Sequence, residues 1–239
     1  MTLALILFVV FGAVLAQSMV GFGSAMIAMG VLTPLLGLST AAPLVALIAA
    51  TLELAVLVVY RAALNWRAVW RLILGSIIGI PFGMLIVQYV DQRIALGVLG
   101  GVICTYVVYA WLGRKPPTLS ATTVWTYGAG LIAGALGGAY NISGPPVILY
   151  GDCRRWPPEE FKGNLQAFFL ASDALVVLFH AWAGNLTTAV WTNYAFTVPV
   201  IGLAVWLGVR WSRRIAGHQL RQLTLGLMML VGLRLVAIV

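Results

Sequence analysis

Charged side chains are scarce in this sequence of 239 residues. Only 8% of the residues are Asp, Glu, Lys or Arg, whereas 62% are hydrophobic and the mean hydropathy is +1.02. A soluble domain has roughly a quarter charged residues, so this chain has too few to cover a water-facing surface. We therefore expect an all-α polytopic membrane protein.

Residues that could do chemistry are also few. Two cysteines and two histidines far apart in the chain do not suggest a metal site or a disulfide framework. The motifs G-x-S-x-G and H-E-x-x-H and the Walker loop are absent. We expect no enzymatic activity, no catalytic residues, no metal and no cofactor. The net charge of +8 fits cationic loops that orient a membrane protein better than it fits a nucleic-acid partner.

Long apolar runs, in contrast, are abundant. Six are suited to a single crossing of about 30 Å of hydrocarbon: approximately 40–60, 72–90, 94–112, 163–183, 189–209 and 219–239. Two further apolar regions, 2–36 and 120–150, are longer than one span and contain polar, glycine-rich interruptions. No Lys or Arg precedes the first run, so it lacks the start of a cleaved signal peptide and we expect it to be retained.

The distribution of Lys and Arg favours a hairpin of two short helices in each long region. If both regions were single crossings, the loop cations would divide five against eight between the two faces. With two hairpins, only Arg93 and Arg234 lie opposite the rest, which are Arg61, Arg67, Arg71, Arg114, Lys115, Arg154, Arg155, Lys162, Arg210, Arg213, Arg214 and Arg221. Cytoplasmic loops carry the excess of cations, so we expect both termini outside.

The order of elements predicts two inverted repeats, at 1–115 and 116–239. Each consists of a hairpin followed by three spans. The string AVW at 68–70 recurs at 189–191, and Thr51 and Ser172 fall at the same offset of 121 residues. An odd number of full crossings per half inverts the second half, which is typical of secondary transporters with a site between the repeats.

The two interruptions are the candidate binding site. A helix break at membrane depth frees amide N–H groups and exposes the positive end of the next helix, and such groups bind oxyanions. The predicted substrate-binding residues are Gln17, Ser18, Gly21, Phe22, Gly23 and Ser24 in the first interruption, and Tyr140, Asn141, Ser143, Gly144 and Pro145 in the second. The alternative is that these glycines only allow close helix packing.

Close packing is the role that we expect for two regular glycine stripes elsewhere. They are Gly75-x3-Gly79-x3-Gly83 and Gly130-x3-Gly134-x3-Gly138, and they have no polar neighbours of this kind.

Two of the six acidic residues, Glu53 and Asp173, lie inside predicted spans. Each costs on the order of 2.5–3.5 kcal/mol at a bilayer centre, which makes both candidates for proton coupling. The alternative role is a protonated structural group bonded to a neighbouring helix. Asn164 and Gln166, near the start of the span with Asp173, either line an entrance or cap the helix.

The segments AQSMVGFGSAMIAMGVLTPLL and GALGGAYNISGPPVILYGDCRRW resemble the paired signature segments of the TauE/SafE sulfite and organosulfonate exporters, also called the TSUP family. The resemblance covers essentially the whole chain. It assigns the two motifs to Gln17, Gly21, Gly23 and Pro34, and to Gly138, Ser143, Gly144 and Pro145. The first motif departs from the commoner glycine run at Ser24-Ala25.

This resemblance implies a secondary transporter, in the direction of export, for small sulfur-containing anions such as sulfite, sulfonates or sulfoacetate. The anion would bind at the midplane between the two glycine-rich interruptions of a multi-pass protein of the cell inner membrane. An anion channel and a proton-coupled importer of a small organic anion are the alternatives. The expected partners are the anion and the lipid bilayer, with a homodimer left open.

Overall fold

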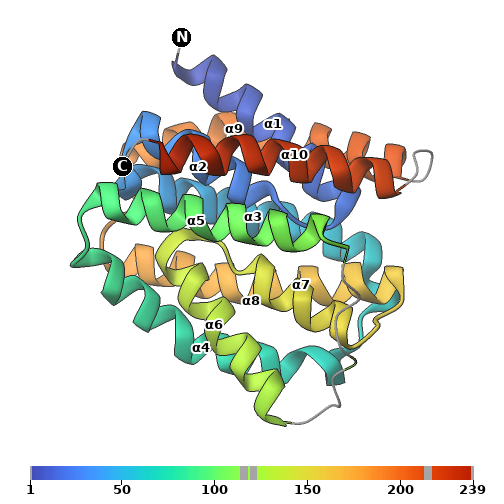
Figure 1. Ribbon diagram of the computed structural model, residues 1–239. Helices are drawn as coiled ribbons and strands as arrows, with labels where there is room; N and C mark the ends of the chain where they lie inside the picture. The colour runs from blue at the N-terminus through green and yellow to red at the C-terminus, as the bar shows by residue number, and fades with distance from the viewer. Residues whose placement is uncertain (1, 114–117, 119–122, 213–216, 238–239) are drawn as a thin grey trace.

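The computed structural model describes residues 2–113, 118, 123–212 and 217–237, and this part of the chain is all-helical (Figure 1). Its elements are α1 (Thr2–Val20), α2 (Ser24–Leu36), α3 (Leu38–Tyr60), the short 3-10 helix η1 (Arg61–Ala63), α4 (Trp66–Gln88), α5 (Gln92–Trp111), α6 (Thr123–Tyr140), α7 (Gly144–Cys153), α8 (Pro158–Trp182), α9 (Thr188–Ser212) and α10 (Gly217–Val236). The prediction of an all-α membrane protein is confirmed.

Six described helices are long and apolar enough to cross a membrane, namely α1, α3, α4, α5, α8 and α9. α1 belongs to the first predicted hairpin and also reaches spanning length. α10 covers most of the predicted span over 219–239 but is not among these six helices. The division of the chain into hairpins and spans stays a prediction.

Each long apolar region is divided into two helices at its predicted interruption. After α1, Gly21 and Gly23 have φ values of 101° and 110°, which residues with a side chain rarely adopt. After α6, Asn141 has a φ of 55°, a left-handed value that asparagine tolerates better than most residues. Pro145 and Pro146 then occupy the first turn of α7, where a missing amide hydrogen costs least.

The two glycine stripes hold α4 against α6. One stripe lies on each helix and they face one another: Gly75, Gly79 and Gly83 against Gly130, Gly134 and Gly138. A Cβ atom at any of these six positions would collide with the backbone of the partner helix. The prediction that these stripes serve close helix packing is therefore confirmed.

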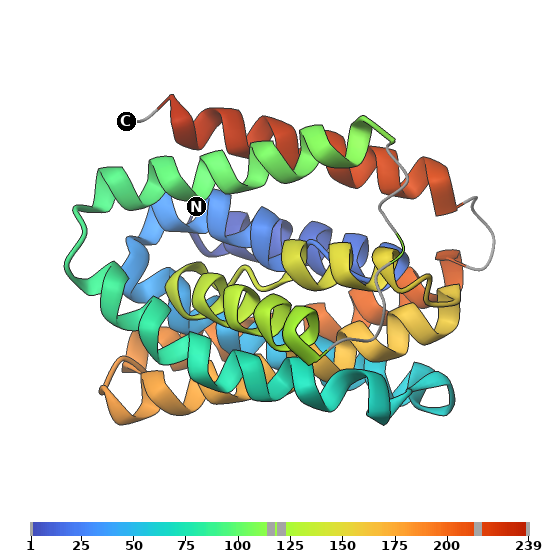
Figure 2. The same ribbon diagram turned by 60° about the horizontal axis from the view of Figure 1, so that its bottom comes forward.

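The loops separate into two ends of the bundle. In Figure 2 the α3–α4 connection, the end of α7 and the end of α9 lie at the right. The α4–α5 and α8–α9 connections and the end of α10 lie at the left, with Arg93 and Arg234. Arg114, Lys115, Arg213 and Arg214 lie outside the described residues. Which end faces the cytoplasm stays a prediction.

The helix pairs with the most contacts each join one helix from the first predicted half to one from the second. α1 packs on α9 and α6 packs on α4, while α3 packs on α8 and α5 on α10. The Thr51 hydroxyl of α3 lies 2.6 Å from the Tyr194 hydroxyl of α9, and Ser172 of α8 lies 3.1 Å from Ser76 of α4. This pattern favours two related halves, and the inverted repeat with its boundary at 115 stays a prediction.

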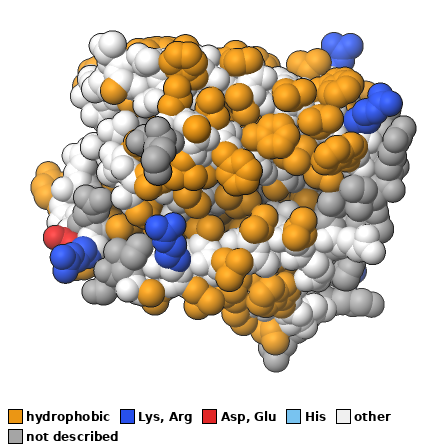
Figure 3. All heavy atoms as spheres, turned by 90° about the horizontal axis from the view of Figure 1, so that it is seen from above, with side chains coloured by type: hydrophobic (Ala, Val, Ile, Leu, Met, Phe, Trp, Pro, Cys, Tyr) orange, Lys and Arg blue, Asp and Glu red, His pale blue; other side chains and the backbone are white. Residues whose placement is uncertain are grey.

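Apolar side chains cover much of the outer surface, as the face in Figure 3 shows. Phe8 is 75% exposed and Trp182 is 86% exposed. A surface of this kind is stable against lipid and not against water. The polar residues of the predicted site lie inside the bundle instead.

Candidate functional site

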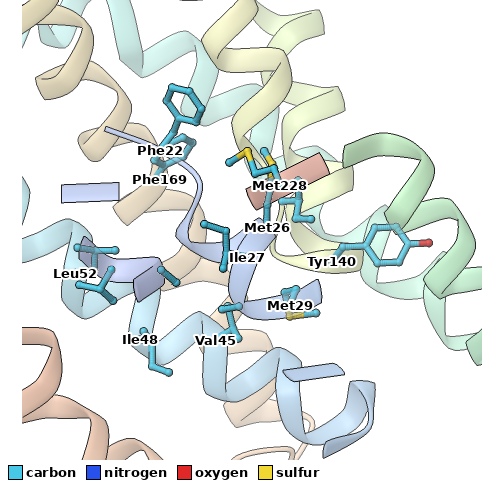
Figure 4. Close-up of a cluster of buried hydrophobic side chains, with 14 of the residues drawn as sticks. Phe22, Met26, Ile27, Met29, Val45, Ile48, Leu52, Tyr140, Phe169 and Met228 are labelled. Carbon is cyan, nitrogen blue, oxygen red and sulfur yellow. The ribbon is translucent and has the colours of Figure 1, made fainter. Parts of the chain in front are cut away.

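Both helix breaks open onto one small space, which we call the central cavity. Its wall consists of Gln17, Gly23, Ala25, Met26, Glu53, Asn141, Ile142, Ser143, Gly144, Phe169 and Asp173. The volume is about 20 Å³, which is room for about one water molecule. In this conformation the cavity is therefore too small to hold a larger solute. Two residues of its wall, Met26 and Phe169, also belong to the cluster of buried apolar side chains drawn in Figure 4.

Side chains from α1 and α8 hold the first break in shape. Gln17 Oε1 accepts hydrogen bonds from the Ser24 amide at 3.0 Å and from Ser24 Oγ at 2.6 Å. Gln166 Nε2 of α8 donates to the Gly21 carbonyl at 2.8 Å. With the break held in this way, the first turn of α2 reaches the cavity at Ala25 and Met26. The amides of a first helical turn have no intrahelical acceptor, so they can bind an anion.

The second break is anchored to α3. Asn141 Nδ2 donates to the Ala42 carbonyl at 2.7 Å, and the Asn141 amide donates to the Gly137 carbonyl at 2.8 Å. Its Oδ1 is buried without a hydrogen-bond partner among the described residues. Because Pro145 and Pro146 lack amide hydrogens, α7 offers fewer donors to the cavity than α2 does.

The two intramembrane acids meet in the central cavity. Glu53 comes from α3 and Asp173 from α8, both are 3% exposed, and both line the wall of this small cavity as neighbours. Glu53 Oε2 has no hydrogen-bond partner within the described part of the chain. Two ionised carboxylates in contact repel each other, so the geometry suits a pair that shares one proton. The sequence suggested two separate candidates, and the structure makes them one group.

Some predicted site residues do not reach the cavity wall: Ser18, Gly21, Phe22, Ser24, Tyr140 and Pro145. Ser18 Oγ donates to the Val14 carbonyl of its own helix at 2.7 Å. Phe22 packs edge-on against the Tyr106 ring at 6.0 Å, and the Tyr140 ring points away from α2 (Figure 4). Successive residues of a helix or tight turn point in different directions, so a contiguous motif cannot line one cavity throughout.

The sequence identified only part of what α8 contributes. α8 begins at Pro158, so Asn164 and Gln166 lie within the helix and the capping alternative is wrong. Phe169 was missed because an apolar side chain in an apolar span carries no signal of its own. Its spacing from Gln166 and Asp173, both singled out in the sequence, places all three on one helical face, and that pattern could have revealed it.

Two larger hollows lie towards the ends of the bundle. The His180 hollow, of about 540 Å³, includes Ala42, Gly138 and His180 and lies beside the second break. The Lys162 hollow, of about 300 Å³, includes Tyr60, Lys162 and Ser212 and lies beside the first break. Within the described ranges, no three or more His, Cys, Asp or Glu side chains gather as a metal site would require.

Comparisons with known proteins agree with this architecture. Residues 5–235 match the family described as "Sulfite exporter TauE/SafE". The chain is 30% identical over 226 residues to the "Probable sulfite/organosulfonate exporter TauE" of Cupriavidus necator, covering 90% of this chain and 86% of that protein. It is 28% identical over 175 residues to the "Probable inner membrane transporter protein TsaS" of Comamonas testosteroni, covering 72% of each. No solved structure matches.

Proposed function

Because this chain belongs to the sulfite exporter TauE/SafE family, we propose that it carries small sulfur-containing anions, such as sulfite, sulfonates or sulfoacetate. The protein is a multi-pass transporter of the inner membrane and not an enzyme. The observation that supports the proposed binding site is the central cavity, where both helix breaks and the carboxyl pair come together.

The proposed substrate site uses the first-turn amides at Ala25 and Met26, the positive end of α2 and the Ser143 hydroxyl as donors to the anion. The Glu53–Asp173 pair holds a proton when the anion is bound, because an ionised pair would repel it. Since the cavity is too small for the anion, transport requires it to widen and to open alternately toward the His180 hollow and the Lys162 hollow.

Export is the proposed direction. Moving one charge through 100 mV is worth about 2.3 kcal/mol, so a divalent anion that leaves a negative cell interior gains about twice that amount. The anion then needs no accompanying ion. The names of the family and of the Cupriavidus relative both say exporter and point the same way.

Proton-coupled import is the second candidate, and the position of the carboxyl pair favours it. An anion that enters a negative interior moves against the potential and needs a cotransported cation. A carboxyl pair on the wall of the substrate cavity is placed to carry a proton together with the anion. Measuring flux in both directions across a defined pH gradient separates the two candidates.

Counterflow of labelled sulfite into proteoliposomes tests the proposed function. We expect uptake that unlabelled sulfite or sulfoacetate inhibits and that acetate does not. Ser143→Ala should raise the KM several-fold because it removes a donor from the cavity wall. The matched substitution Ser18→Ala should leave the KM unchanged, since Ser18 bonds within its own helix. Absence of counterflow for every sulfur oxyanion would refute the proposal, and single-channel conductance would indicate a pore.

A further inference from the structure

Lys162 of α8 reaches the backbone of the first break. Its Nζ donates to the Met19 carbonyl at 3.1 Å, lies 3.4 Å from the Tyr60 hydroxyl and sits 5.2 Å from the centre of the Tyr60 ring. A Cβ atom at Gly21 would come within 3.3 Å of Lys162 Cγ. The lysine side chain thus lies directly against the break and ties α8 to the last turn of α1.

The same lysine lines the Lys162 hollow. The wall of this hollow consists of Val59, Tyr60, Ala62, Ala63, Pro158, Glu159, Lys162 and Ser212. These residues lie at the end of the bundle that has most of the described cations (Figure 2). No carboxylate oxygen of the described residues lies within 4.0 Å of Lys162 Nζ, although Glu159 also lines the hollow. The ammonium is therefore available to a small anion.

One face of α8 extends from this hollow to the central cavity. Lys162, Gln166, Phe169 and Asp173 follow one another at spacings of four, three and four residues, which places them on one helical face. Gln166 bonds the break at Gly21, whereas Phe169 and Asp173 line the cavity. This face of α8 therefore extends from the lysine to the wall of the central cavity.

We propose that the Lys162 hollow is an entry site for oxyanions, in which Lys162 binds the anion and, in doing so, releases the Met19 carbonyl so that the first break can move. The identity of the anion rests on the proposed function, while the site itself does not. An ammonium on a flexible stem can exchange a carbonyl for a sulfonate or sulfite oxygen, and the charged acceptor makes the stronger hydrogen bond.

Transport kinetics measured from each face of the membrane test this proposal. Lys162→Met should raise the KM for sulfite supplied at the lysine end roughly tenfold, the loss expected for one charge-assisted hydrogen bond. The KM at the other face should stay unchanged, and Lys162→Arg should restore wild-type values. Arg67→Met is the matched control, since it removes an exposed cation from the same end without lining the hollow. An equal rise in the KM at both faces would show that Lys162 only stabilises the structure, and it would overturn the proposal.

A second measurement does not depend on transport. In a Cys104→Ala, Cys153→Ala background, a cysteine introduced by Ala62→Cys lies on the wall of the hollow. Sulfate and methanesulfonate should slow its alkylation with Lys162 present and not with Lys162→Met. Absence of slowing overturns the entry site even if sulfite counterflow succeeds, and slowing supports it even if counterflow fails.

Lipid headgroups also present oxyanions to this end of the protein. Both measurements are therefore repeated in phosphatidylcholine alone and with added phosphatidylglycerol. We expect the same results in both membranes. If the effect of Lys162→Met appears only with phosphatidylglycerol, a lipid occupies the hollow and the proposal is wrong.

Discussion

At the scale of single residues, the centre of the protein combines groups of opposite character. The α2 amides and the Ser143 hydroxyl are donors, whereas the Glu53 Oε2 and Asn141 Oδ1 atoms are buried acceptors without partners among the described residues. A buried polar atom without a partner is costly, so each of these two atoms calls for an explanation, such as a functional role or a bound water. A proton or a bound water would satisfy these acceptors.

The carboxyl pair leads to the first residue-scale prediction. Asp173→Asn keeps the size of the side chain and its hydrogen-bonding capacity but cannot exchange a proton. We expect the rate of sulfite transport to lose most of its pH dependence. Under proton-coupled import, the second candidate, the proton flux that accompanies sulfite should also disappear, as recorded with a pH-sensitive dye in proteoliposomes.

The matched control is Asp91→Asn, the same chemical change at an exposed helix N-cap. Asparagine caps a helix about as well as aspartate, so this variant should behave as wild type. An unchanged rate and pH profile in Asp173→Asn would remove the proton role and leave the structural alternative.

At the scale of helices, the glycines of this chain serve two different purposes. Gly21 and Gly23 provide the positive φ values that end α1, whereas the stripes on α4 and α6 let two backbones approach. The α4–α6 contact fixes α6, and with it the second break, against the rest of the bundle. In lipid, such packing replaces the hydrophobic effect as the force that joins helices.

Two identical substitutions in α6 test the packing role. Gly134→Ala places a Cβ atom against the backbone of α4 at Ser76, whereas a Cβ atom at Gly128 meets nothing within 4 Å. We expect Gly134→Ala to destabilise the protein by about 1–3 kcal/mol, the usual cost of overpacking. Gly128→Ala should be neutral or slightly stabilising because alanine favours a helix. Thermal unfolding in detergent measures both, and equal melting temperatures would contradict the packing role.

At the scale of the whole molecule, a small central cavity lies between two hollows near opposite ends of the bundle. The first break lies beside Lys162, near the start of α8, and the second lies beside Ala42, near the start of α3. Each break therefore stands next to a different hollow. Movement of one break at a time would expose the cavity to one side only, as alternating access requires.

The orientation of the molecule in the membrane is testable with single cysteines. Ala62→Cys lies at the end with most of the described cations, and Tyr89→Cys lies at the other end, where Tyr89 is 87% exposed. In a Cys104→Ala, Cys153→Ala background, we expect an impermeant thiol reagent to label Tyr89→Cys in intact cells. Ala62→Cys should react only after the cells are permeabilised, since cation-rich loops stay in the cytoplasm. The reverse pattern would refute the predicted orientation.

Composition and local pattern alone determined the class of protein, the positions of both helix breaks and the purpose of the glycine stripes. These features depend on short-range physics: the hydropathy of a run, the φ range of glycine and the fixed φ of proline. The same local patterns were enough to show the resemblance to the TauE/SafE family. The starts of α4 and α8 were less predictable, because each helix begins with a more polar first turn that precedes its apolar part.

Only the tertiary structure decided which residues share a cavity. Glu53 and Asp173 are far apart in the chain, and nothing local indicates that α3 packs against α8 and brings their carboxyls together. The same packing turns Ser18 and Tyr140 away from the cavity. It brings Phe169 to the cavity wall and Gln166 to the first break at Gly21. A sequence states which groups are present, whereas the packing of one helix face on another sets the direction in which each side chain points.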